Sequence, residues 1–320
     1  MRYNMIAPAY LRRIGLFFTL LILISLGNKS LQSRDLSQDV KSLNYVKVSD
    51  SVVMLYNKKE HGANMTCVAL DDGLVFVDCG LFTEIASQFR ADMEKNFNKK
   101  TLALFLTHAH IDHFFGMDAF NDVQVIASQT SKALFEAQLN IQFETRVEGY
   151  EKIFPKFGDA LQSAKIFLPT KWFEKEMVLG SGKKQLVCQN TGGHTAGSSI
   201  AILESEKVII SGDLVQVDQY CYFGDPSTSM TAWIETLRQW DASDVEKICP
   251  GHGRMVNRDY IPPIISYFEE MISALQTLKK AELTPREVVS HSSLPKGYWP
   301  EGLDKPGWYD YAIARLYQEL

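Results

Sequence analysis

The stretch that decides the fold is Leu-Ala-Leu-Phe-Leu-Thr-His-Ala-His-Ile-Asp-His, residues 102–113. Its first five residues, Leu102–Leu106, are all apolar, which is typical of a short buried strand. Four side chains that can bind a metal ion follow within six residues: His108, His110, Asp112 and His113. In an extended chain, alternation points His108 and His110 to the same side, and a following turn can bring the other two to a neighbouring point.

Three later apolar runs are each followed, within a few residues, by one more residue of this kind: His194, Asp213 and His252. Each has a glycine beside it, which lets the backbone approach a site closely. Ligand sites in α/β folds gather at strand ends, and histidine nitrogen with carboxylate oxygen suits zinc. An isolated histidine is more often a surface or core residue. Here, however, five of the seven histidines fall in these motifs, which favours a metal centre with two ions sharing one water.

The surrounding pattern predicts an α/β chain. Short apolar runs with turns between them, among them residues 199–203 and 208–211, predict strands. A helix is predicted over Thr83–Asn96, where apolar residues recur at intervals of four. Further helices are expected within Ser131–Gln162, over Thr231–Trp240 and over Tyr260–Lys280. The order of strands followed by helices occurs twice without a Pro-rich or Ser-rich linker, so one sandwich is expected rather than two independent domains.

The ordered set His-x-His-x-Asp-His, Gly-His-Thr, Gly-Asp and Pro-Gly-His-Gly resembles the metallo-β-lactamase superfamily over roughly residues 51–260. The resemblance implies an αββα four-layer sandwich with metal ions at one edge. It assigns the first zinc to His108, His110 and His194, the second zinc to Asp112, His113 and His252, and a bridging role to Asp213. Asp78, at the end of a strand, resembles the structural aspartate of the family and is expected to support the ligands.

This resemblance implies a zinc-dependent hydrolase in which a hydroxide shared by two zinc ions attacks a carbonyl-type bond: an ester, lactone, thioester or amide. Asp112 is the expected catalytic residue, which orients the nucleophile and passes a proton to the leaving group. A β-lactamase and a non-catalytic metal-binding member of the same fold are the alternatives. All seven ligand residues are present, which favours an enzyme, although the same ligands also accept iron or manganese.

The residues after the bridging aspartate bear on the substrate. β-Lactamases of this superfamily generally use a cysteine or another residue there, so Asp213 favours the glyoxalase-like, thioesterase and lactonase branches, and Cys221 is expected to be structural. Lactonases that open acyl-homoserine lactones often carry a tyrosine three residues after the aspartate, where this chain has Gln216. Tyr220 and Phe223 are weak candidates for contact with a small-molecule substrate.

The N-terminus differs from the rest of the chain. Three arginines precede an uncharged run over residues 14–26, and small or polar residues follow, which is the pattern of a signal peptide. We expect export to the periplasm or outside the cell, with a membrane anchor as the alternative. The expected organisation is a signal peptide (1–27), an N-terminal segment (28–50), a catalytic domain (51–282) and a C-terminal extension (283–320). A net charge of -5 does not indicate a nucleic-acid binder.

Overall fold

The first half of the chain forms a seven-stranded sheet with the strand order β1-β2-β3-β4-β5-β6-β7. The structure is a computed structural model that describes residues 40–57, 62–140 and 164–320. Strands β1 to β4 pair antiparallel, and β4 to β7 pair parallel. The strands are β1 Tyr45–Lys47, β2 Val52–Leu55, β3 Met65–Ala69, β4 Leu74–Val77, β5 Thr101–Phe105, β6 Gln124–Ser128 and β7 Lys171–Phe173.

The second half forms a six-stranded sheet with the order β13-β12-β11-β10-β9-β8. Only β11 and β12 pair parallel among its described strands; the other pairs are antiparallel. The strands are β8 Glu176–Leu179, β9 Leu186–Asn190, β10 Ser199–Leu203, β11 Val208–Gln216, β12 Lys247–His252 and β13 Val256–Asn257.

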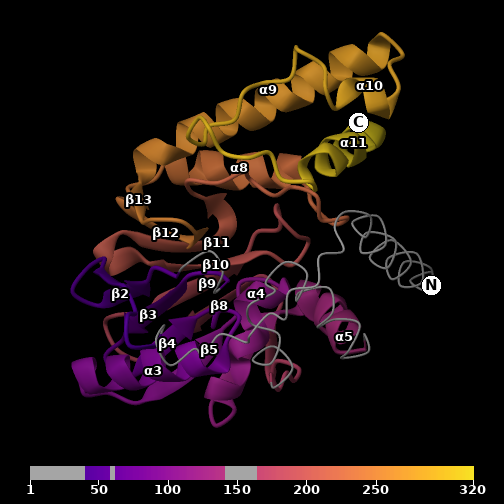
Figure 1. The fold of residues 1–320 in the computed structure, drawn as a ribbon. Coiled ribbons are helices and arrows are strands. Elements are labelled where there is room, and N and C mark those ends of the chain that lie inside the picture. Colours follow the sequence, from indigo (N-terminus) through magenta and orange to yellow (C-terminus); the bar gives the residue numbers. More distant parts are fainter. Residues whose placement is uncertain (1–39, 58–61, 141–163) are drawn as a thin grey trace.

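The helices lie on the two outer faces of this pair of sheets (Figure 1). The helices of the first half are α3 Thr83–Phe97, α4 Ile111–Phe114 and α5 Lys132–Asn140. Those of the second half are α8 Met230–Asp241, α9 Ile261–Lys280, α10 Pro285–Val288 and α11 Tyr309–Glu319. The result is the predicted four-layer αββα arrangement. None of the helices in the described ranges combines the length and the apolarity that a membrane crossing needs.

Two-residue alternation along the strands explains the layers. In β4, Leu74 and Phe76 face the cluster beneath α3, whereas Val75 and Val77 face the cluster between the two sheets. All four side chains are buried, because the sheet is covered on both faces. Apolar residues at every position of a short strand therefore signal a central strand of this sandwich.

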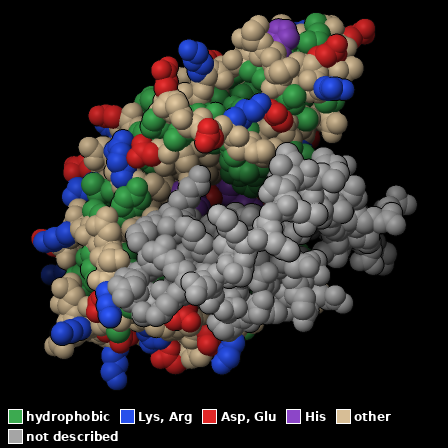
Figure 2. Space-filling view, viewed as in Figure 1, with side chains coloured by type: hydrophobic (Ala, Val, Ile, Leu, Met, Phe, Trp, Pro, Cys, Tyr) green, Lys and Arg blue, Asp and Glu red, His purple; other side chains and the backbone are tan. Residues whose placement is uncertain are grey.

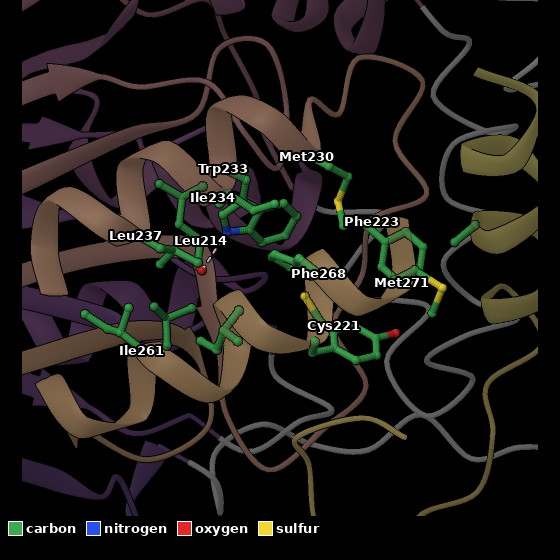
Figure 3. Close-up of a cluster of buried hydrophobic side chains, with 14 of the residues drawn as sticks. Leu214, Cys221, Phe223, Met230, Trp233, Ile234, Leu237, Ile261, Phe268 and Met271 are labelled. Carbon is green, nitrogen blue, oxygen red and sulfur yellow. Dashed lines mark hydrogen bonds between the residues drawn. The ribbon is translucent and has the colours of Figure 1, made fainter. Parts of the chain in front are cut away.

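A third apolar cluster joins the second sheet to α8, α9 and α11 (Figure 3). Trp233 of α8 is fully buried there, and its indole N–H donates to the backbone O of Leu214, 2.9 Å away. Its ring packs at 4.8 Å from that of Phe268 in α9. Because Leu214 follows Asp213 directly, this packing anchors the strand end that carries a candidate ligand.

The structure also differs from the sequence-based expectations. Strand β11 extends to Gln216, five residues beyond the expected end, and β1 pairs with β2 although it lies in the segment assigned to residues 28–50. The tail from residue 283 contains α10 and α11. Of the expected helical region 131–162, only α5 lies in the described part. The expected signal peptide, residues 1–27, lies outside the described residues.

Candidate metal centre

Strand β5 and helix α4 place the residues of the first motif. Strand β5 ends at Phe105, and the chain passes through His108 before α4 begins at Ile111. His110 is the extended residue just before α4, with φ -78° and ψ 135°. This change from extended to helical backbone separates His108 and His110 from Asp112 and His113, as the turn in the sequence predicted.

The first group of potential ligands contains three histidines. Nδ1 of His110 lies 3.0 Å from Nε2 of His108 and 3.0 Å from Nε2 of His194. Zinc–nitrogen bonds of the usual length in tetrahedral geometry would separate two ligand nitrogens by about 3.3 Å. The three nitrogens therefore already lie near the spacing that a zinc ion needs.

The second group contains Asp112, His113 and His252, and their ligand atoms also lie within 4.8 Å of one another. Nε2 of His252 is 3.2 Å from Oδ2 of Asp112. Asp112 is half-buried, whereas His113 is fully buried. Asp112 is thus the carboxylate of the cluster that is more open to a bound molecule.

Asp213 lies between the two groups. Its Oδ2 is 3.5 Å from Nε2 of His194, and its Oδ1 is 3.2 Å from Nε2 of His113 and 3.5 Å from Nε2 of His252. One carboxylate oxygen faces each group, which is the arrangement of a bridging ligand. A Cβ atom on Gly251 would lie 2.0 Å from Oδ1 of Asp213, so only glycine leaves room for this carboxylate.

Asp78 organises the other side of this cluster. Its Oδ1 accepts the backbone N–H of Thr107 at 2.8 Å, and its Oδ2 lies 2.7 Å from Nδ1 of His113. The Thr107 hydroxyl donates to Oδ2 of Asp78 and lies 3.0 Å from Nδ1 of His108. Asp78 adopts φ +58°, a left-handed conformation that its fixed contacts hold in place. One buried carboxylate therefore contacts His113 directly and reaches His108 through Thr107.

A loop after β11 supports the other two histidines of the first group. Nε2 of His110 lies 3.1 Å from Oδ2 of Asp225, and Nδ1 of His194 lies 3.0 Å from the backbone O of Tyr222. Sequence reasoning missed Asp225. The sequence feature that could have identified it is the pair Gly224-Asp225. This pair repeats the Gly-Asp pattern of the bridging residue but follows no predicted strand.

The electrostatics of the cluster favour a cation. Burial raises the pKa of Asp112, but His113 and His252 outweigh it and lower the pKa to about 2. Burial likewise raises the pKa of Asp213, yet His252 and His113 hold it well below its ordinary value. Burial, together with the neighbouring His113, keeps the pKa of His108 well below its ordinary value. Burial lowers the pKa of His113 and His252, but Asp213 and the neighbouring carboxylates outweigh it and raise both. Ionised carboxylates and neutral imidazoles are the forms that bind a metal ion, so these two histidines would release a proton on binding.

Two buried atoms test whether a metal ion fits. Nε2 of His113 and Oδ1 of Asp213 are buried and have no hydrogen-bond partner of acceptable geometry. Buried polar atoms are nearly always satisfied, so an unsatisfied pair needs an explanation. Both atoms face the cluster, and a cation between them would supply the missing interaction. The donor set of five imidazoles and two carboxylates suits zinc.

The two candidate substrate residues both pack against aromatic residues of the C-terminal extension. Phe223 is fully buried and packs 5.9 Å from the ring of Tyr309, so its side chain is part of the core and cannot line an open site. Tyr220 packs against Trp299 and Tyr309. Tyr222 lies closer to the metal-type cluster, with its ring 5.8 Å from that of His110.

All five cysteines are buried and unpaired. Burial raises the pKa of Cys221 to about 12, so its thiol stays protonated and is a poor metal ligand. This agrees with the expectation that Cys221 is structural. Figure 2 shows purple histidine surface at the base of a hollow between the two halves, beside the residues drawn in grey.

A four-layer αββα sandwich with a histidine and aspartate cluster at its strand ends is the class of protein that these observations define. The sequence profile of the metallo-beta-lactamase superfamily matches residues 59–252. The chain belongs to this superfamily of hydrolases, as the motifs predicted.

Curated relatives and solved structures are similar to the chain. An acyl-coenzyme A thioesterase MBLAC2 from Gallus gallus is 24% identical over 177 residues, which cover 53% of this chain and 62% of that protein. The matched region thus spans less than two thirds of the relative.

Among the solved structures, a metallo-beta-lactamase from Pontibacter korlensis has a TM-score of 0.56 and 20% identity, covering 71% of this chain and 99% of its own. The stereoselective inverting sec-alkylsulfatase Pisa1 from Pseudomonas sp. has a TM-score of 0.63 and 20% identity, covering 87% of this chain and 50% of its own. These likenesses show the shared fold.

Proposed function

We propose that the chain is an exported hydrolase that holds two zinc ions and cleaves a carbonyl-type bond in a small molecule. The observation that carries this proposal is the pair of ligand groups that share Asp213, together with the two buried atoms that lack a partner. His108, His110 and His194 would hold one ion, and Asp112, His113 and His252 the other, with Asp213 between them. Two bound zinc ions would lower the pKa of water to about 7 and polarise the scissile carbonyl.

Asp112 is the residue that we assign to proton transfer. Its carboxylate is ionised at neutral pH, because its pKa is about 2, and it is more exposed than Asp213. It can therefore accept a hydrogen bond from the attacking water and orient it toward the substrate. It is also placed to deliver a proton to the leaving group after the bond breaks.

We propose thioesters and esters as the first substrates to test. The support is the curated relative, which is named as an acyl-coenzyme A thioesterase, and the bridging Asp213, which is unlike the cysteine of many β-lactamases. Tyr222 beside His110 offers an aromatic surface to a bound acyl group.

A substrate panel on zinc-loaded protein tests the reaction. It contains acyl thioesters, simple esters, acyl-homoserine lactones, nitrocefin and a secondary alkyl sulfate, because a structural neighbour is named as an alkylsulfatase. We expect His108→Ala to abolish turnover and Asp112→Asn, with its metal content verified, to lower kcat at least about 100-fold. Full activity of metal-loaded Asp112→Asn would exclude the proton-transfer role.

Two outcomes would change the assignment. Nitrocefin hydrolysis at ordinary enzyme rates would make a β-lactamase the better description. No turnover on any substrate, with two zinc ions bound, would favour the non-catalytic metal-binding alternative.

Export is proposed from the N-terminal sequence pattern alone. Expression of the full chain, fractionation, and determination of the N-terminal residue of the recovered protein test it. A new N-terminus near residue 28 in the periplasm or medium supports a cleaved signal peptide. An intact Met1 in the membrane fraction supports the anchor instead.

A further inference from the structure

One buried charge in the molecule has no role in the proposed reaction. Arg315, on helix α11 in the C-terminal extension, is only 7% exposed, and its Nε has no hydrogen-bond partner. Its Nη1 pairs with Glu319, and its Nη2 donates to the backbone O of Phe223, 2.8 Å away and 92 residues earlier in the chain. A buried arginine costs free energy through desolvation, so an apolar side chain would pack more favourably here unless the contact matters.

The carbonyl that Arg315 binds belongs to a loop that reaches the metal centre. This loop, residues 217–229, connects β11 with α8. On one side of Phe223, the backbone O of Tyr222 faces Nδ1 of His194. On the other side, two residues on, Asp225 faces Nε2 of His110. The peptide that Arg315 holds therefore lies between the two supports of the first histidine group.

Other contacts from the C-terminal extension reach the same loop. Tyr309 packs against Phe223 and Tyr220, and Trp308 packs edge-on to Tyr222 with the ring centres 5.0 Å apart. These aromatic contacts hold the loop against α11, but their geometry is not strongly directional. The hydrogen bond from Arg315, in contrast, fixes the position of one carbonyl. Figure 1 shows α11 beside the end of α8, on the same side of the second sheet.

We propose that Arg315 is a positioning residue for the first metal group, acting through the Phe223 carbonyl on the loop that supports His110 and His194. This inference rests on the metal binding in the proposed function. Partners of ligand histidines fix the ring orientation and commonly change metal affinity about 10- to 100-fold when they are removed. Arg315 is one step further from the metal, so its loss should act at the lower end of that range.

The experiment measures metal binding by the full chain, without reference to any substrate. Metal-stripped protein is titrated with zinc against a chelator, and separately with cobalt(II), whose visible absorption reports the ligand geometry. We expect Arg315→Met to weaken one of the two zinc sites about tenfold and to change the cobalt spectrum. Glu319→Gln is the matched control: it removes the ion pair of Arg315 but leaves the bond to Phe223, and it should bind zinc as the native chain does.

A double-mutant cycle separates positioning from general stability. Asp225→Asn removes the carboxylate beside His110, and the effects of Arg315→Met and Asp225→Asn on zinc affinity should be less than additive if both act through one loop. Native zinc affinity and an unchanged cobalt spectrum in Arg315→Met would overturn the proposal. Fully additive effects would also overturn it.

A second variant keeps the test decisive if Arg315→Met does not fold. Arg315→Lys retains the charge and one donor, and its zinc affinity should fall between those of the native chain and Asp225→Asn. Lower stability with native zinc affinity would make Arg315 merely structural and overturn the proposal. A native chain that binds no zinc would overturn the proposed function itself, whereas bound zinc without any hydrolysis would overturn only the proposed reaction.

Discussion

Four of the five clustered histidines have a protein partner on the ring nitrogen that faces away from the proposed ions: Thr107 for His108, Asp225 for His110, Asp78 for His113 and the Tyr222 carbonyl for His194. Such a partner selects which ring nitrogen carries the proton and leaves the other free to bind a metal ion. The first group, and His113 of the second group, are therefore ordered before any ion arrives. Preorganisation of this kind raises metal affinity, because less freedom is lost on binding.

Gly251→Ala tests how closely the backbone must approach the bridging carboxylate. The added Cβ would lie 2.0 Å from Oδ1 of Asp213, and the neighbouring backbone of Gly212 is only 2.8 Å away. Asp213 must therefore move, and we expect zinc affinity to fall at least about tenfold. Competitive zinc titration of the folded variant measures the change.

Gly302→Ala is the matched control for this substitution. Nothing lies within 4 Å of a Cβ at Gly302, although its φ of +85° makes the change slightly destabilising. Zinc affinity should stay at the native value in this control. Equal zinc affinity in Gly251→Ala and the native chain would show that Asp213 is not held where the structure places it.

All seven proposed ligand residues could be predicted from the sequence, because each comes after an apolar run typical of a strand and stands in a short, specific motif. Asp225 was missed, since it lies in a loop whose path depends on contacts with α11, such as the bond between Phe223 and Arg315, 92 residues apart. The burial of Phe223 was equally hidden: its neighbours Tyr220 and Tyr222 are half-exposed, and no local pattern distinguishes the three aromatic residues.

At the scale of elements, the strands with two buried faces were the most predictable. Strand β10, Ser199–Leu203, has the expected bounds. Strand β8 was missed because, among the described strands, it pairs only with β9, and none of its four side chains is fully buried. Helix α11 was missed because the tail is rich in Pro, Trp and Tyr. Its stability comes from packing against the third cluster rather than from the helix propensity of its sequence.

Glu206 links a turn of the second sheet to the turn before β2 in the first sheet. It lies in the turn after β10, where Oε2 accepts the backbone N–H of Ser51 at 3.1 Å and Oε1 accepts from Lys184 at 2.9 Å. Burial raises the pKa of Glu206, but hydrogen bonds from serine hydroxyls, Lys184 and the Ser51 N–H outweigh it and lower the pKa to about 2. The carboxylate therefore stabilises the folded state in its ionised form.

Glu206→Gln should lower the free energy of unfolding at pH 7 by about 1–2 kcal/mol, with allowance for solvent screening. Because the folded pKa lies below the unfolded one, this contribution is complete above pH 4.5 and is lost as the pH falls toward about 2. Urea unfolding at pH 7 and pH 3 measures it. The difference between the native chain and the variant should shrink at pH 3.

Glu204→Gln, in the same turn but exposed, controls for the loss of one negative charge. It should unfold like the native chain at both pH values. A Glu206→Gln effect that is equally large at pH 3 and pH 7 would contradict an origin in the ionised carboxylate.

At the scale of the whole molecule, the two sheets supply ligands from both halves of the chain. His108 to His113 follow a strand of the first sheet, whereas in the second sheet His194 follows β9, Asp213 lies within β11 and His252 ends β12. A metal ion in either group would therefore link the halves, in addition to the apolar cluster between the sheets. Removing the ions should loosen the contact between the sheets rather than unfold either one locally.

Zinc should accordingly stabilise the entire fold. An ion that binds only the folded state at 100 times its dissociation constant adds about 2.7 kcal/mol, which corresponds to a rise in Tm of several degrees for a chain of this size. We expect the Tm of metal-stripped protein to rise with added zinc and not to change with magnesium, which prefers oxygen ligands.

The rise in Tm with zinc should diminish as the pH is lowered from 7 to 5, because the clustered imidazoles bind a metal only when they are neutral. His252→Ala removes a ligand of the second group alone, so about half of the shift should persist in it. The same Tm with and without zinc in the native chain would mean that the two halves are not joined through a metal centre.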